Sequence, residues 1–225
     1  MLIQKATINW DEGTPKSTVF DDIYYNTIDG IEEADYVFVQ GNNISNRLTN
    51  SNIQTIAETG FGTGLNFLNT AQAFQQLNTG KNRLHFISVE KFPLDKSALQ
   101  KIYNEWPQFK EITDQLLSQY PPQAAGFHRI SLLEGKIQLT LMLGDATDCL
   151  SKLVATVDAW YLDGFSPSKN PDMWSPELFR EIARLSKPGT TFSTFTSASV
   201  VRKGLQAVGF DVRKQPGFGK KREMS

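Results

Sequence analysis

The stretch Asn52–Phe67, NIQTIAETGFGTGLNF, decides how the rest of this chain is organised. Ile53, Ile56 and Ala57 in its first half make a short apolar run, which predicts a buried parallel strand that ends at Glu58. Three glycines follow at every second position: Gly60, Gly62 and Gly64. A helical pattern of apolar residues then starts at Leu65. A strand, a glycine-rich turn and a helix in this order predict the first half of a βαβ unit, whose turn lets a ligand approach the backbone.

The spacing of the glycines separates two kinds of cofactor. The dinucleotide fingerprint is G-x-G-x-x-G, followed by an acidic residue about 20 positions later. Here Leu65 stands in place of the third glycine, and the next strand-end acid, Glu90, comes too late. An acid followed by G-x-G-x-G resembles motif I of the S-adenosylmethionine (SAM) methyltransferases. A nucleotide site and a glycine turn without a ligand stay open at this point.

Composition and charge limit the class of protein. A chain of 225 residues, 40% of them hydrophobic, predicts one globular core. The formal net charge of −1 does not mark a nucleic-acid binder, so such a role requires a local basic patch. Cys149 is the only cysteine, which fits a reducing, cytoplasmic environment. No apolar run predicts a signal peptide or a membrane span, and two lone histidines predict no metal site.

Strands and helices alternate after residue 51, which predicts a mostly parallel sheet with helices on both faces. The expected later strands are Leu84–Glu90, Ile137–Leu143, Val157–Leu162, Thr190–Phe195 and Phe210–Lys214. The alternation predicts an α/β fold, and the resemblance to the SAM-dependent methyltransferases implies their Rossmann-like class I fold with a mostly parallel, seven-stranded sheet. Its last strand is expected to begin in KKREMS and to be cut short. Residues 1–50 are expected to form a small β-rich extension with strands at Thr7–Trp10 and Tyr36–Gln40, and residues 51–225 the methyltransferase domain. Helices are expected at about Leu65–Leu77 and at Ser199–Ala207.

Four acids fall at the carboxyl ends of predicted strands: Glu58, Glu90, Asp145 and Asp163. Ligands of open parallel sheets bind at that edge, so the four predict one shared site. The resemblance implies that the first acid lies at the methionine end of SAM, that the second takes the ribose hydroxyls, and that Asp145 binds the adenine amine. We expect the cofactor to be held by the three glycines, the four acids, and their neighbours Lys91 and Ala146. Asp145 serves equally well as a helix N-cap.

Several segments together resemble one family more closely. They are ETGFGTGLNFL, SVEKFPL, YLDGFSPSKNPDMWSPELF, LSKPGTTFSTFTSASVVRKGLQAVGF and GFGKKREM, of which DGFSPSKNPDMW is the most specific. This family is the methyltransferase domain of MnmC, the bifunctional tRNA wobble-uridine enzyme. The resemblance implies methyl transfer from SAM to the amine of 5-aminomethyl-2-thiouridine at tRNA position 34. It also implies the tRNA anticodon arm as the partner.

In that family an FAD-dependent oxidoreductase domain usually follows on the same chain, where it removes a carboxymethyl group to give the free amine. No FAD fingerprint precedes the end of this sequence at Ser225. We therefore expect an isolated methyltransferase domain that uses SAM, with the fused oxidoreductase domain belonging to the full-length protein.

The expected catalytic residues are Asp163 and Phe165. The sulfonium of SAM is already a good leaving group, so the protein supplies mainly position and electrostatics. Asp163 is expected to accept an N–H from the substrate amine and to orient its lone pair. Phe165 is expected to stack on the uracil ring. A loop-capping aspartate and a packed aromatic are the plainer interpretations.

Further residues are expected to bind the substrate. Asp22 and Tyr25 lie in the segment FDDIYY and either line the pocket or belong to an exposed strand. Trp174 is expected to stack on the base or to be packed. A basic stretch near the carboxyl end is expected to contact phosphates, with solvated surface charge as the alternative: Lys220, Lys221 and Arg222.

Three rival functions remain at this stage. The first is a SAM-dependent N-methyltransferase of a small-molecule or protein amine, which salt-dependent tRNA binding would separate from a tRNA enzyme. The second is a nucleotide-dependent oxidoreductase, opposed by the position of Leu65. The third is a non-catalytic RNA-binding module, opposed by Asp163 with Gly164 and Phe165 where the chemistry requires them.

Overall fold

A parallel sheet organises the chain. The computed structural model describes residues 3–11, 13–26, 28–77, 80, 82–219 and 223–225. Within these ranges the large sheet has six strands, in the order β6 (Gly126–Leu132), β7 (Ile137–Leu143), β5 (Arg83–Glu90), β4 (Ile53–Glu58), β8 (Val157–Tyr161) and β9 (Ser186–Ser193). Only β6 runs antiparallel to its neighbour, β7. The α/β class with a mostly parallel sheet is therefore confirmed.

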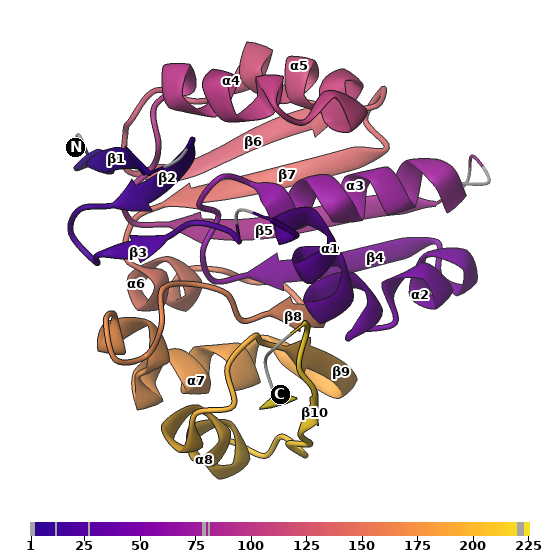
Figure 1. Cartoon of the computed structure of the whole chain (residues 1–225). Helices are drawn as coiled ribbons and strands as arrows, with labels where there is room; N and C mark the ends of the chain where they lie inside the picture. Colours follow the sequence, from indigo (N-terminus) through magenta and orange to yellow (C-terminus); the bar gives the residue numbers. More distant parts are fainter. Residues whose placement is uncertain (1–2, 12, 27, 78–79, 81, 220–222) are drawn as a thin grey trace.

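Helices cover both faces of this sheet (Figure 1). One face packs against α3 (Leu65–Leu77), α4 (Lys96–Asn104), the 3₁₀ helix η2 (Pro107–Phe109) and α5 (Lys110–Gln119). The other packs against α6 (Ala146–Ser151), the 3₁₀ helix η3 (Pro171–Trp174), α7 (Pro176–Arg184) and α8 (Ser199–Ala207). Successive strand residues point to opposite faces, so Phe86 joins the first core and Ile87 the second. This explains why the central strands read as continuous apolar runs.

The amino-terminal segment is β-rich only through residue 23. Three short antiparallel strands, β1 (Ile8–Asp11), β2 (Thr14–Ser17) and β3 (Asp22–Ile23), form a separate small sheet. They are followed by α1 (Gly30–Ala34), the π-helix η1 (Asp35–Gln40) and α2 (Ile44–Asn50). Residues from both sides of the predicted boundary at 50 share one hydrophobic core, since Phe38 and Leu48 cluster with Ile56 and Phe67.

The predicted strand at Tyr36–Gln40 is wrong, because this segment is helical. Ala34, Val37 and Phe38 are all buried, and their spacing of three and four residues places them on one side of a helix. The sequence DYVFVQ is rich in β-branched and aromatic residues, which favour a strand. Packing of this side against the core overrode that preference.

The carboxyl-terminal part also differs from the prediction. Phe210–Lys214 is not a strand, and the short strands β10 (Gln215–Pro216) and β11 (Glu223–Met224) pair with each other instead of joining the sheet. Phe210 packs its ring against Phe192 of β9 at 5.3 Å between centroids, so its apolar character serves side-chain packing. Ser225 exchanges two backbone hydrogen bonds with Thr194, just beyond β9. Of the predicted last strand in KKREMS, the described residues show β11, which lies outside the large sheet, and this contact of Ser225 with Thr194.

The remaining boundaries follow the sequence closely. The helices predicted from the apolar patterns at 65–77 and 199–207 have these same bounds in α3 and α8. β9 begins four residues before the predicted Thr190, with a register irregularity where it pairs with β8. Within the part of the chain that the structure describes, no helix is long and apolar enough to cross a membrane.

Candidate active site

The glycine turn connects β4 to α3 at the carboxyl edge of the sheet. Gly62 and Gly64 have positive φ angles of 52° and 77°, which favour glycine. A Cβ on Gly60 would lie 3.1 Å from the carbonyl oxygen of Asp163, and one on Gly64 would lie 2.8 Å from the ring of Phe61. Gly60 and Gly62 line the cavity beyond this turn, whereas Gly64 lies behind it and is required for packing.

A cavity of about 780 Å³ opens at this edge. Among the predicted site residues, those that line it are Asp22, Tyr25, Gly60, Gly62, Glu90, Lys91, Asp145, Ala146, Asp163 and Phe165. The predicted residues Glu58, Gly64 and Trp174 do not line it. Lys220, Lys221 and Arg222 lie outside the described residues. The structure thus brings most of the predicted site together around one cavity.

Glu90 at the end of β5 is held by backbone donors. Its Oε2 accepts a hydrogen bond from the amide of Gly62 at 2.8 Å, and its Oε1 accepts one from the amide of Phe92 at 2.7 Å. Burial raises the pKa of this carboxyl to about 7, against the opposing effect of the backbone donors. The amide of Lys91 is a further, weaker backbone donor, and the carboxylate still has acceptor capacity for a ligand hydroxyl.

Asp145 follows β7 and caps helix α6. Its Oδ1 accepts hydrogen bonds from the amides of Thr147 and Asp148, so the N-cap interpretation holds. Its other oxygen lies 3.0 Å from the ammonium of Lys91. Burial alone would raise the pKa of Asp145, but the hydrogen bond from Lys91 and the amides of the helix bring it below the usual value. Capping and cavity lining are compatible here, because both place the side chain at the sheet edge.

Asp163 lines the cavity and is held by hydrogen bonds to its carboxylate and to its backbone carbonyl. Its Oδ2 accepts a hydrogen bond from Nδ2 of Asn66 at 2.7 Å, and its Oδ1 accepts one from the amide of Gly164 at 2.8 Å. The hydroxyl of Thr59 donates to its carbonyl oxygen at 2.7 Å. Asn66 also donates to Glu58, which is 1% exposed. A carboxylate therefore faces the cavity in a fixed orientation.

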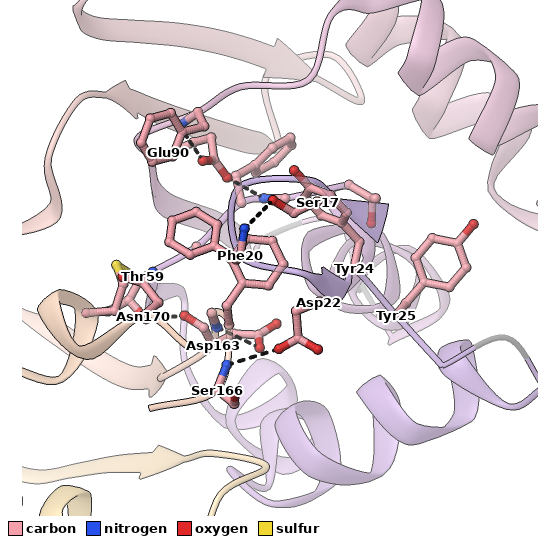
Figure 2. A pocket seen from close by; sticks show the side chains of 18 of the residues that line it. Ser17, Phe20, Asp22, Tyr24, Tyr25, Thr59, Glu90, Asp163, Ser166 and Asn170 are labelled. Carbon is pink, nitrogen blue, oxygen red and sulfur yellow. Dashed lines mark hydrogen bonds between the residues drawn. The ribbon is translucent and has the colours of Figure 1, made fainter. Parts of the chain in front are cut away.

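The amino-terminal segment covers the cavity (Figure 2). The ring of Phe20 stacks on Phe165 with 4.7 Å between centroids and 28° between planes, and Tyr24 meets Phe165 edge-on at 5.3 Å. In the view of Figure 2, Phe20 lies between Glu90 and Asp163. Asp22 accepts a hydrogen bond from the amide of Ser166 at 3.3 Å. Residues far apart in the sequence thus form one wall.

Comparison with known proteins now decides the family. A family model described as S-adenosyl-L-methionine-dependent methyltransferase matches residues 107–225. The chain belongs to this family. SAM is therefore its cofactor, and methyl transfer its reaction class.

Curated relatives of this methyltransferase bear a more specific name. Proteins from Marinomonas sp. (strain MWYL1) and Chromobacterium violaceum are 52% and 50% identical to it, over 99% and 100% of this chain. Both are named tRNA 5-methylaminomethyl-2-thiouridine biosynthesis bifunctional protein MnmC. The chain spans about a third of their length, since it covers 34% of each.

A solved structure supports the fold of the methyltransferase. It is described as MNMC2 from Aquifex aeolicus, and it matches with a TM-score of 0.74 at 24% sequence identity. The match covers 98% of this chain and 69% of the solved one. At this identity the likeness establishes the arrangement of helices and strands.

Trp174 does not have the exposed ring expected of a base-stacking residue. Trp174 is 5% exposed, and its indole N–H donates to the carbonyl oxygen of Phe165 at 3.2 Å. It thus supports the backbone of the expected stacking residue and stays outside the cavity. Tyr25 reaches the cavity but packs edge-on against Trp106, and burial raises the pKa of its phenol to about 12.

Sequence reasoning assigned no role to two residues of the site, Phe20 and Asn66. The segment FDDIYY, which begins at Phe20, signalled an aromatic ring at the site in principle, because it mixes rings with acids. Asn66 gave no signal, since an asparagine in the first turn of a helix is common. Among the described residues, no group of three or more histidine, cysteine or acidic side chains is arranged to bind a metal ion.

Proposed function

We propose that this methyltransferase transfers a methyl group from SAM to the amine of 5-aminomethyl-2-thiouridine at wobble position 34 of tRNA. The relatives' name, over nearly the whole of this chain, supports this substrate. The observation that carries the proposal is the Asp163 carboxylate, held at the cavity beside the glycine turn with a protein hydrogen bond to each of its oxygens. An acceptor in this place suits an amine nucleophile.

The residues present fit the cofactor. The turn lacks side chains where Gly60 and Gly62 line the cavity, and a Cβ on Gly62 would lie 3.3 Å from the ring of Tyr24. Glu90 would accept the ribose hydroxyls through its remaining lone pairs. Asp145, Lys91 and Ala146 would lie around the adenine. SAM supplies an electrophilic methyl group carried on a sulfonium.

The chain's own residues would orient the substrate amine. Asp163 would accept one amine N–H, which directs the nitrogen lone pair away from the carboxylate, and would stabilise the cation formed on methylation. Phe165 and Phe20 would hold the extruded base, because aromatic rings stack on bases of any kind. Asp22 adds a second acid to the same side of the cavity. Positioning and charge account for the catalysis proposed, since SAM needs no further activation.

The partner would be the anticodon arm of a tRNA, with Lys220, Lys221 and Arg222 near its phosphates. The relatives are named bifunctional and are about three times longer than this chain. We propose that an FAD-dependent oxidoreductase domain supplies the free amine in the full-length protein, and that the enzyme acts in the cytoplasm, where tRNA is found.

One experiment tests this function directly. The protein is incubated with labelled SAM and tRNA that carries 5-aminomethyl-2-thiouridine, and the tRNA is digested to nucleosides for mass spectrometry. A mass increase of one methyl group on this nucleoside supports the proposal. Methylation of free amines with unmodified tRNA would favour a small-molecule or protein substrate. tRNA that carries an unmodified wobble uridine is the control, because it lacks the nucleophile.

A further inference from the structure

One amide in the cavity wall, that of Asn66, joins two carboxylates. Nδ2 of Asn66 lies 2.8 Å from Oε1 of Glu58 and 2.7 Å from Oδ2 of Asp163. An amide nitrogen carries two hydrogens, so both bonds form at once. With the nitrogen held between two acceptors, the side chain has one favoured orientation.

Glu58 holds this amide from a position that no ligand in the cavity reaches. It is 1% exposed and does not line the cavity, although it ends the strand that leads into the glycine turn. Its Oε2 accepts a hydrogen bond from the hydroxyl of Ser88 at 2.6 Å. Both of its oxygens are therefore engaged by the protein. Glu58 is therefore unsuited to contact a cofactor in the cavity, but it is well placed to hold the side chain of Asn66.

Asp163 receives the other end of the same network. Asn66 binds one of its oxygens and the amide of Gly164 binds the other, so rotation of the carboxylate would break at least one hydrogen bond. The lone pairs that remain are directed by this geometry before any substrate arrives. A group oriented in advance needs little reorganisation in the transition state.

We propose that Asn66 is a positioning residue for methyl transfer and that Glu58 is its anchor. Glu58 holds Asn66, Asn66 holds Oδ2 of Asp163, and the substrate amine meets a carboxylate that is already oriented. This inference rests on the proposed function, because it gives Asp163 the role of amine acceptor. It replaces the expected contact between Glu58 and SAM with a role one residue removed from the cavity.

The first test compares two asparagines of one helix. Asn66→Asp removes the bridging donor with little change of volume, and Asn69→Asp is the matched control. Both asparagines are 5% exposed, and Asn69 donates to the carbonyl oxygen of Ile31 at 2.9 Å without lining the cavity. Each variant therefore loses a buried hydrogen bond of α3, but only one loses the contact with Asp163.

Turnover and its pH dependence separate positioning from stability. For Asn66→Asp we expect kcat to fall about 100-fold, the scale of a misplacement near 1 Å, with the Kd for SAM within about threefold. The acidic limb of its kcat profile should move to higher pH, because an added carboxyl beside Asp163 disfavours the ionised form. Asn69→Asp should keep the wild-type profile. Equal losses of kcat with unshifted profiles in both variants would overturn the inference.

A second pair of variants examines the anchor. Glu58→Leu removes the acceptor for Asn66, and Glu58→Gln keeps an oxygen that can accept the same N–H. We expect Glu58→Gln to recover most of the kcat that Glu58→Leu loses. Equal kcat in the two variants would contradict the anchoring role.

Nuclear magnetic resonance tests the network without a substrate. In the wild-type protein, both side-chain amide protons of Asn66 should be protected from solvent exchange, and Glu58→Gln should preserve this protection. Two unprotected protons would overturn the inference whatever the enzyme methylates. Wild-type protein that leaves 5-aminomethyl-2-thiouridine unmethylated would instead overturn the proposed function, while protected amide protons would still support the network.

Discussion

Two parts of the chain meet at the cavity, and they are held in different ways. The edge of the parallel sheet supplies Glu90 and Asp163, whose carboxylates accept hydrogen bonds from backbone amides. The cover formed by residues 17–25 contacts this edge through its side chains: the ring of Phe20 stacks on Phe165, and the Asp22 carboxylate accepts the amide of Ser166 and pairs with Lys169 at 3.2 Å. Backbone donors attached to a packed sheet are rigid, whereas side-chain contacts rearrange at low cost.

The rigid sheet edge and the more adaptable cover suit different roles in the proposed reaction. Charge that must be in place before the reaction belongs on the sheet edge, where both oxygens of each acid have a fixed partner. In the proposed function a tRNA base enters and leaves the cavity, so the cover that contacts this base must be able to rearrange. Changes at the edge should therefore alter turnover and cofactor binding strongly, and changes in the cover should alter substrate affinity more mildly.

Substitution of Asp163 is expected to have the largest effect, a loss of turnover. Asp163→Asn should lower kcat about 100- to 1000-fold, the cost of removing one preorganised electrostatic group. The Kd for SAM should stay within about threefold of wild type, because the loss falls mainly in the transition state. Single-turnover assays on tRNA with 5-aminomethyl-2-thiouridine measure this. Asp148→Asn, in the first turn of α6 and outside the cavity lining, is the control. Wild-type turnover in Asp163→Asn would leave Asp163 as a loop cap.

The next effect concerns Glu90 and the pH dependence of stability. A glutamate in the unfolded chain titrates near 4.5, and burial raises the pKa of Glu90 to about 7. Its neutral form is therefore favoured in the folded protein. The stabilisation is complete below pH 4.5 and is lost as the pH rises through about 7.

Urea unfolding of the wild type and Glu90→Gln measures this contribution. Glutamine stays neutral, so the free energy of unfolding of the wild type should fall relative to that of the variant between pH 4.5 and 7.5, by up to about 3 kcal/mol. The buried Glu58 is present in both proteins, so most of its contribution cancels, because Glu90 is only the smallest of the causes that raise the pKa of Glu58. A constant difference between the two curves over this range would show that Glu90 ionises normally.

A further prediction concerns the proposed contact between Glu90 and SAM. Glu90→Ala should weaken SAM binding by about 1–3 kcal/mol, since the ribose hydroxyls lose their acceptor. In the wild type, SAM affinity should increase as the pH rises through about 7, because the carboxylate accepts hydrogen bonds better than the acid. Titration calorimetry at several pH values gives both results. An unchanged Kd in the variant would remove Glu90 from the cofactor site.

The smallest expected effect lies in the cover. Phe20→Ala removes the ring stacked on Phe165, and stacking of this kind contributes about 1 kcal/mol. We expect KM for the tRNA to rise about fivefold while the Kd for SAM stays near wild type. Ile28→Ala is the control, because Ile28 is 85% exposed in the same segment and does not line the cavity. A loss of kcat as large as that of Asp163→Asn would end the distinction between edge and cover.

Prediction from the sequence worked best where the backbone itself fixes the outcome. The acids Glu58, Glu90, Asp145 and Asp163 all follow β-strands, and parallel strands place their carboxyl ends at one edge. The same reasoning could not tell that Glu58 faces away from the cavity while Glu90 faces into it. Each side chain's direction depends on how its strand end meets the neighbouring helix and turn.

The sequence by itself determined the glycine turn, the alternation of strands and helices, and the residue types at the sheet edge, because these depend on local spacing and periodicity. Only the tertiary structure decided that Tyr36–Gln40 is helical, that Trp174 supports the backbone of Phe165, and that Phe20 enters the cavity. It also decided that Asn66, which donates to Glu58, also donates to Asp163, 97 positions later in the sequence. Such contacts form between segments that only folding brings together, so no local pattern records them.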